Sequence, residues 1–328
     1  MTGGSPPVIY SEGRIDMPVF LGSLDIILQD GFMYSLIAMG YYISYSILDF
    51  PDLTAEGTVL SGGVVFGLLV KLGVSPHLAL IAAFLVGFLF GSVTGMLHVK
   101  LKIRPLLCGI LVSTALISVN LIATVVGMGG NFKGDGALST IDLGRGVPTI
   151  LRVFPSSILP NDFLGLNIRK LLTFFVIALI FKLILDFYLK TKNGLLLRAA
   201  GGNPRFVTML SRDEGRSKIL GLAIGNGYAA AAGALIVQSR GNVNQNIGIG
   251  MIVIGLASLI IGLSVFSKVR FLKPTTKVIL GSVIYQGCLG LATFLGVPSA
   301  YNKILMAVLF TIALVISGKT RKGGVKNA

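Results

Sequence analysis

The sequence predicts an all-α, polytopic membrane protein, and three observations carry this prediction. Hydrophobic residues make up 53% of the 328 residues, charged residues make up only 12%, and the mean hydropathy is +0.85. A soluble protein carries about 25% charged residues. Several apolar runs approach the ~20 residues that a helix needs to cross a bilayer. Because backbone groups in lipid need partners within a helix or closed barrel, we expect a transmembrane helical bundle with about 8 to 10 spanning helices.

The spanning helices are expected where the apolar runs lie. These runs are near residues 26–48, 54–71, 77–99, 105–127, 171–189, 219–238, 247–266, 275–297 and 301–317. The length of the chain favours one bundle over several domains. We therefore expect a transmembrane domain over 25–317, an N-terminal segment over 1–24 that is partly surface or flexible, and a basic cytoplasmic tail over 318–328.

Positive charge between the runs predicts the topology. The formal net charge is +15, and 18 of the 28 Lys and Arg residues lie in the segments 100–104, 190–218, 268–277 and 319–326. Short cytoplasmic loops of membrane proteins carry an excess of Lys and Arg, so these segments should be cytoplasmic. This placement explains the charge better than nucleic-acid binding does. Counting the spans back from a cytoplasmic C-terminal tail places the N-terminus outside. If 54–71 is re-entrant, the same count places it inside.

Two longer segments separate the runs. Residues 129–168 are rich in Gly and Pro with nearly balanced charge, which predicts an ordered extracytoplasmic loop or short surface helices and a candidate docking surface. Residues 190–218 hold seven Lys or Arg and two acids. Their apolar positions predict short helices on either side of Gly201-Gly202-Asn203-Pro204, where Gly and Pro should break a continuous helix. A charged, partly helical loop of this kind is a suitable contact surface for an energy-supplying subunit.

Polar residues interrupt the chain at corresponding places in its two halves. The sets are Asp49, Asp52, Thr54 and Glu56 after the first run, and Asn242, Asn244, Gln245 and Asn246 after the sixth. Broken helices at matching positions of an inverted repeat point to a translocation site near the bilayer midplane. The structural alternative is an interfacial loop in which Asp52 or Thr54 caps the helix that begins at Ala55. That alternative is favoured for Asp49, and both readings stay open for Asp52, Thr54 and Glu56.

Small and polar residues inside the predicted helices indicate close packing or a path. Gly87, Gly91 and Gly95 form a ridge for helix approach, which favours packing within the bundle over a homodimer seam. Small residues such as Gly255 run through the seventh span. Asn226 and Gln238 in the sixth span would either line a path or bond to neighbouring helices.

Other polar residues have structural explanations. Lys182 and Asp186 lie four apart near a cytoplasmic helix end and predict a snorkelling ion pair. His77 and His98 sit at helix ends without companion ligands, and Cys108 and Cys288 have no partner spacing. We therefore expect no catalytic residue, no metal site and no cofactor in this chain.

Three stretches of the sequence resemble permease subunits of binding-protein-dependent ABC importers, in the branch that contains ribose and branched-chain amino acid permeases. They are Leu48–Gly57, Gly194–Pro204 and Gly250–Gly262, and the resemblance spans roughly residues 25–317. The second stretch is the most specific. In this family it implies the cytoplasmic coupling helix that contacts the ATPase, here represented by Leu197, Arg198, Ala199, Gly201, Asn203, Pro204 and Arg205.

The resemblance also implies partners and a location. It implies a homodimer in the bacterial cytoplasmic membrane, two ATPase subunits that hold Mg-ATP, and a solute-binding protein or lipoprotein. The subgroup resembles permeases associated with aromatic amino acids such as tryptophan or tyrosine. The residues expected along the translocation path are Asp52, Thr54, Glu56, Asn226, Gln238, Asn244 and Asn246. The alternative is an ion-coupled secondary transporter without an ATPase, for which Asp52 and Glu56 are the candidate coupling residues.

Overall fold

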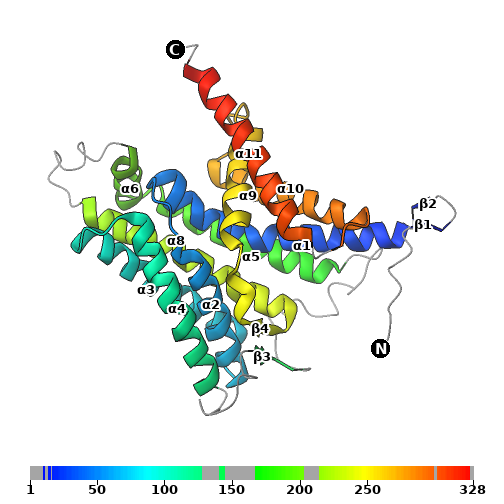
Figure 1. Cartoon of the computed structure of the whole chain (residues 1–328), viewed down its shortest axis with the longest axis horizontal. Helices are drawn as coiled ribbons and strands as arrows, with labels where there is room; N and C mark the ends of the chain where they lie inside the picture. Colours follow the sequence, from blue (N-terminus) through cyan, green and yellow to red (C-terminus); the bar gives the residue numbers. More distant parts are fainter. Residues whose placement is uncertain are drawn as a thin grey trace.

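The computed structural model describes residues 10–11, 14–15, 17–127, 140–144, 167–202, 214–298 and 301–325, which form a helical bundle (Figure 1). The helices are α1 Met17–Tyr41, the π-helical η1 Tyr42–Ile47, α2 Thr54–Lys71, α3 Pro76–Lys100, α4 Pro105–Gly127, α5 Ile168–Tyr188, α6 Lys192–Gly202, α8 Glu214–Arg240, the 3-10 helix η3 Gln245–Gly248, α9 Met251–Val265, α10 Pro274–Phe294 and α11 Asn302–Val325. Two antiparallel strand pairs complete it: β1 Tyr10–Ser11 with β2 Arg14–Ile15, and β3 Thr140–Asp142 with β4 Asn242–Asn244.

The predicted multi-pass helical bundle is confirmed. Within the described residues, seven segments are long and apolar enough to cross a membrane: α2, α3, α4, α5, α8, Gln245–Val265 and α10. Helix α1 is not in this set despite its 25 residues. Its mean hydropathy is lowered by the polar residues Asp25, Gln29 and Asp30, which lie close together near the middle of the helix.

Helix α8 is the centre of the bundle. Burial covers 83% of its most apolar window, against 28% for α3 and for α4, whose other faces carry exposed Leu and Ile side chains suited to lipid. Helices α2 and α3 pack against α8. A Cβ atom at Gly87 or Gly91 would collide with the α8 backbone, and one at Gly95 would lie 2.8 Å from Ile219 Cα. The glycine ridge therefore packs within the chain.

Two predicted helices have different boundaries in the structure. The first was expected over 26–48, but α1 begins at Met17 and its continuation over Tyr42–Ile47 is π-helical. The seventh was expected over 247–266, but α9 begins only at Met251. Gly250 before it has φ 85°, a left-handed conformation that favours glycine and separates α9 from η3. Hydropathy alone does not register such breaks, because the residues around them remain apolar.

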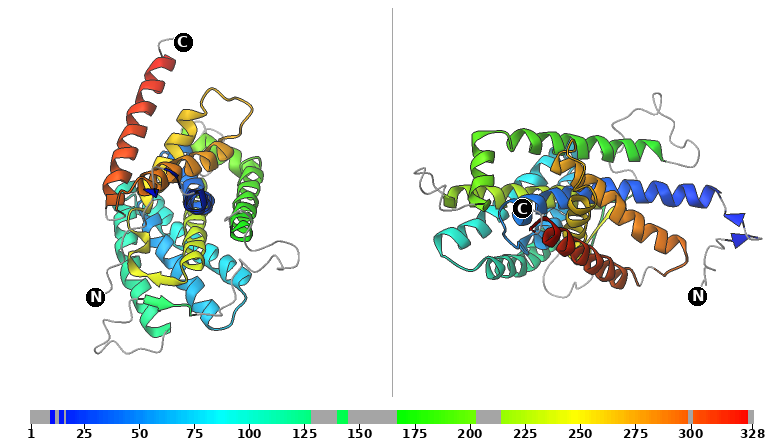
Figure 2. Two further views of the ribbon diagram at one scale, coloured as in Figure 1. Left: turned by 90° about the vertical axis from the view of Figure 1, so that its right-hand side faces the viewer. Right: turned by 90° about the horizontal axis from the view of Figure 1, so that it is seen from above.

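The basic ends of the helices gather on one side. In Figure 1, α6, the α9–α10 connection and the end of α11 lie toward the upper left, whereas the β3–β4 pair and the start of α1 lie on the opposite side. Figure 2 shows α6 turned across the end of α5, and α11 leaning away from the other helices. The basic side is the one predicted to be cytoplasmic, and on that prediction the β3–β4 pair lies on the outer side. If α2 spans the membrane, the same prediction puts the start of α1 outside, and if α2 is re-entrant it puts it inside.

Candidate functional site

A buried hydrogen-bonded cluster joins the start of α2 to the middle of α8. Asp52 is 3% exposed, and its Oδ1 accepts a hydrogen bond from the Thr54 backbone N–H at 2.9 Å. Its Oδ2 accepts from Asn226 Nδ2 at 2.6 Å. Asn226 Oδ1 accepts in turn from Thr58 Oγ1 at 3.0 Å, and Thr54 Oγ1 lies 2.9 Å from Thr94 Oγ1 on α3. Asp52, one residue before the N-cap Leu53, therefore accepts from the first backbone N–H of α2 and fastens α2 to α8.

Glu56 connects the two polar interruptions. Its Oε1 accepts a hydrogen bond from the Gly250 backbone N–H at 2.9 Å, directly before α9. A Cβ at Gly248 would collide with the Glu56 carbonyl oxygen, so η3 approaches α2 more closely than a side chain would allow. The segments that interrupt the two halves of the sequence thus meet in space. The role of Asp52, Thr54, Glu56 and Asn226 in a translocation path remains a prediction.

The remaining predicted path residues lie apart from this cluster. Asn244 and Asn246 are exposed on the outer side, where Asn244 Oδ1 accepts from the Asn246 N–H at 2.9 Å and begins η3. Gln238 on α8 is 4% exposed, and neither its Oε1 nor its Nε2 has a hydrogen-bond partner among the described residues. Gly255 packs against the Tyr41 ring, which places α9 on α1.

The predicted coupling element begins as the helix α6. Within this helix, Leu197 is fully buried, Ala199 is half-buried, and Arg198 is exposed. Gly201 lies directly against the Ile47 carbonyl oxygen of η1, where a Cβ would collide. Helix α6 also packs on α8. The other predicted coupling residues, Asn203, Pro204 and Arg205, lie outside the described residues, as does the second short helix expected after them.

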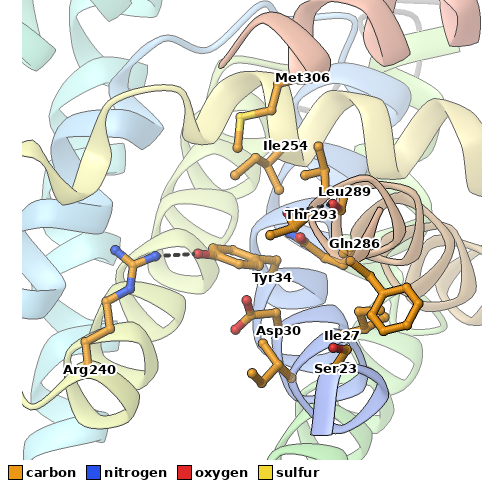
Figure 3. Close-up of a pocket in the computed structure, with 13 residues that line it drawn as sticks. Ser23, Ile27, Asp30, Tyr34, Arg240, Ile254, Gln286, Leu289, Thr293 and Met306 are labelled. Atoms are coloured by element: carbon orange, nitrogen blue, oxygen red, sulfur yellow. Dashed lines mark hydrogen bonds between the residues drawn. The ribbon is translucent and has the colours of Figure 1, made fainter. Parts of the chain in front are cut away.

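Two cavities flank these elements. The inner one has a volume of about 590 Å³ between η1, α6 and α9, and its wall includes Asp49, Arg198 and Gly201. The outer one has a volume of about 410 Å³ between α1, the end of α8, α9, α10 and α11 (Figure 3). Six polar side chains line the outer cavity: Ser23, Asp30, Tyr34, Arg240, Gln286 and Thr293.

The patterns of the sequence point to none of these six residues. Asp30 and Tyr34 lie in the apolar run predicted as the first span, and Arg240 follows the sixth. Arg240 Nη2 donates to Tyr34 Oη at 2.9 Å, although the two residues are 206 positions apart. The signal that was available is Asp30 itself, because an ionisable residue inside a membrane span is a functional candidate by default.

The comparisons with known proteins agree with this architecture. The model of a family described as branched-chain amino acid transport system / permease component matches residues 23–314. A tyrosine transport system permease protein of Clostridioides difficile is 36% identical over 89% of this chain and 90% of its own length. An uncharacterized protein of Rickettsia prowazekii is 30% identical over 85% of this chain and 91% of its own length.

A third relative is the probable branched-chain amino acid transport permease protein LivH of Methanocaldococcus jannaschii, 27% identical over 64% of this chain and 65% of its own length. No solved structure matches the chain significantly. The chain is a multi-pass protein of the bacterial inner membrane, and it belongs to the permease component family of branched-chain amino acid transport systems.

Proposed function

We propose that this chain is the permease subunit of an ABC importer, two copies of which form the translocation path for a small solute. The solute is an amino acid, with an aromatic one as the first candidate, as supported by the similarity to a tyrosine permease. A solute-binding protein or lipoprotein delivers the solute on the outer side. Two copies of a separate ATPase bind Mg-ATP and drive transport, so the permease needs no nucleotide or cofactor of its own.

The observation that carries this proposal is the placement of α6. Its buried face, through Leu197 and Gly201, is fixed to α8 and η1. Its other face presents Arg198 and the 56% exposed Leu195 on the basic, cytoplasmic side. A helix anchored to the bundle on one face and free on the other is suited to receive a partner and pass its movement to the spanning helices.

The test is co-purification of the tagged chain with the ATPase encoded beside it. We compare the wild type with Arg198→Glu, which reverses an exposed charge at the rim of the inner cavity, and with Arg198→Glu plus Gly201→Leu, which also breaks the contact with η1. Lys303→Glu, an exposed charge reversal at the outer end of α11, is the control. We expect the wild type and the control to retain the ATPase in stoichiometric amount. Both α6 variants should lose it while remaining folded.

The ion-coupled alternative predicts a different result. If no ATPase associates with the wild type, and proteoliposomes of this chain alone accumulate the amino acid under an ion gradient, the importer proposal is wrong. Asp52 and Glu56 then become the first residues to test as ion ligands.

A further inference from the structure

The outer cavity contains two opposite charges that attract each other electrostatically but form no direct ion pair among the described residues. Asp30 projects into the cavity from α1, and Arg240 projects from the end of α8 (Figure 3). Across the part of the chain that the structure describes, Asp30 makes no hydrogen bond or ion pair, and Arg240 bonds only to the Tyr34 hydroxyl. Asp30 is half-buried and Arg240 is exposed at the end of α8. Ionisable side chains that line a cavity of a membrane protein usually mark a functional site.

A third polar group in the same wall lacks a partner. Gln286 on α10 is 7% exposed, and its Nε2 has no hydrogen-bond acceptor among the described residues. Leaving a buried donor unpaired costs free energy, so a site that holds one is suited to a ligand with an acceptor. The cavity therefore offers one anion on α1, and a cation and an amide donor on α8 and α10.

The rest of the cavity wall is largely apolar. It is formed by side chains that include Ile27, Ile254, Leu289, Phe294 and Met306. Binding sites for small molecules have volumes of roughly 300 to 1,000 Å³, with apolar walls and a few placed polar groups. The volume of about 410 Å³ suits a ligand the size of one amino acid.

We infer that the outer cavity binds a single α-amino acid as its zwitterion. The Asp30 carboxylate accepts hydrogen bonds from the α-ammonium group, and the Arg240 guanidinium and Gln286 Nε2 donate to the α-carboxylate. A large apolar or aromatic side chain packs against Ile254, Leu289 and Phe294. This inference rests on the proposed function, and it names the substrate class at the outer half of the path.

The test measures binding of four probes to the purified full chain. L-tyrosine carries both charges, its methyl ester lacks the carboxylate, N-acetyl-L-tyrosine lacks the ammonium group, and L-leucine replaces the aromatic ring by an aliphatic chain. We expect the wild type to bind L-tyrosine or L-leucine about ten-fold or more tightly than the ester or the acetyl compound, because each removes one charge-assisted contact.

The variants should change this preference in a crossed pattern. Arg240→Gln should lose the discrimination against the methyl ester and keep that against the acetyl compound, while Asp30→Asn should do the reverse. Arg240→Lys, which retains the cation, should preserve part of the discrimination. Lys303→Gln and Asp142→Asn, which remove exposed charges on the outer side, are the matched controls and should bind all probes like the wild type.

Two results would overturn the inference. One is that neither amino acid binds to the folded wild type. The other is that Arg240→Gln and Asp30→Asn weaken every probe by the same factor, as a purely structural role requires. If the chain co-purifies with its ATPase but fails this binding test, only the proposed amino acid site is wrong. A chain that binds the zwitterion but never the ATPase overturns the importer proposal alone.

Discussion

At the scale of single residues, Asn226 is the side chain on which the buried polar cluster depends. It lies in the middle of α8, is fully buried, and supplies the side-chain donor for Asp52 Oδ2. Thr58 has a second acceptor in the Ala55 carbonyl, so it depends less on Asn226. The Asp52 carboxylate is also held by the backbone and the side chain of Thr54, but Asn226 supplies the 2.6 Å bond to its Oδ2.

We therefore expect Asn226→Leu to destabilise the protein by about 2 to 5 kcal/mol, because it leaves a buried carboxylate oxygen without its amide donor. Thermal or denaturant unfolding in detergent measures this loss. Asn120→Leu is the matched control, since Asn120 is similarly buried but, among the described residues, its side chain bonds only to the Gly57 carbonyl, at 3.3 Å. Equal losses in the two variants would contradict the central role of Asn226.

The sequence predicted part of this cluster and missed its geometry. Capping by Asp52 or Thr54 of a helix beginning at Ala55 was one open alternative; the helix begins at Thr54 with N-cap Leu53, and Asp52 accepts from its first N–H. The bond from Asn226 could not be predicted, because it joins residues 174 positions apart. The same limit applies to the outer cavity: Asp30 and Arg240 belong to helices that no local pattern brings together, and an apolar window averages out a single carboxylate.

At the scale of elements, hydropathy located the spans well and their ends poorly. Helix α8 was expected over 219–238 but extends over Glu214–Arg240, because an ion pair between Glu214 and Lys218 supports its polar first turn. The corresponding polar interruptions in the two halves were predicted from composition. That they contact each other through Glu56 and Gly250 required the packing of α2 on η3, which depends on the whole fold.

Helices α5 and α10 are joined near the cytoplasmic side by one carboxylate. Asp186 forms the predicted ion pair with Lys182 at 3.1 Å. It also accepts hydrogen bonds from Lys273 at 3.0 Å and from Thr275 at 2.6 Å, at the start of α10. A carboxylate beside a helix N-terminus is further stabilised by the helix dipole. Asp186 is therefore an interhelical connection rather than only a snorkelling pair.

We expect Asp186→Ala to loosen the first turn of α10, with a loss of stability of about 1 to 3 kcal/mol, because Thr275 loses its acceptor and two lysines lose their counter-charge. Hydrogen–deuterium exchange should rise in the peptide that contains residues 273–280. Lys182→Met, which removes one partner and leaves Thr275 and Lys273 bonded to Asp186, should leave exchange in that peptide nearly unchanged. Similar exchange in both variants would mean that Asp186 does not hold α10.

At the scale of the whole molecule, one continuous element connects α6, the predicted coupling helix, to the outer cavity. Helix α6 touches η1 at Ile47, η1 continues directly from α1, and α1 carries Asp30 and Tyr34 in the cavity wall. The π-helical stretch lies between the two ends, and such stretches are frequent at functional sites. Movement of α6 would therefore change the cavity through α1, and occupation of the cavity would act back on α6.

This arrangement predicts reciprocal coupling between the two sites. With the ATPase and a non-hydrolysable ATP analogue bound, the affinity of the outer cavity for its amino acid should change by about 5- to 150-fold, and the amino acid should change ATPase affinity by the same factor. Gly201→Ala should reduce this factor, since its added methyl group displaces α6 from Ile47. Gly202→Ala is the control, because a Cβ there meets nothing within 4 Å. Titration calorimetry of each ligand with and without the other gives both factors. Two outcomes would show that α6 and α1 do not communicate through this contact. One is that both affinity factors equal one in the wild type. The other is that Gly202→Ala loses coupling as fully as Gly201→Ala does.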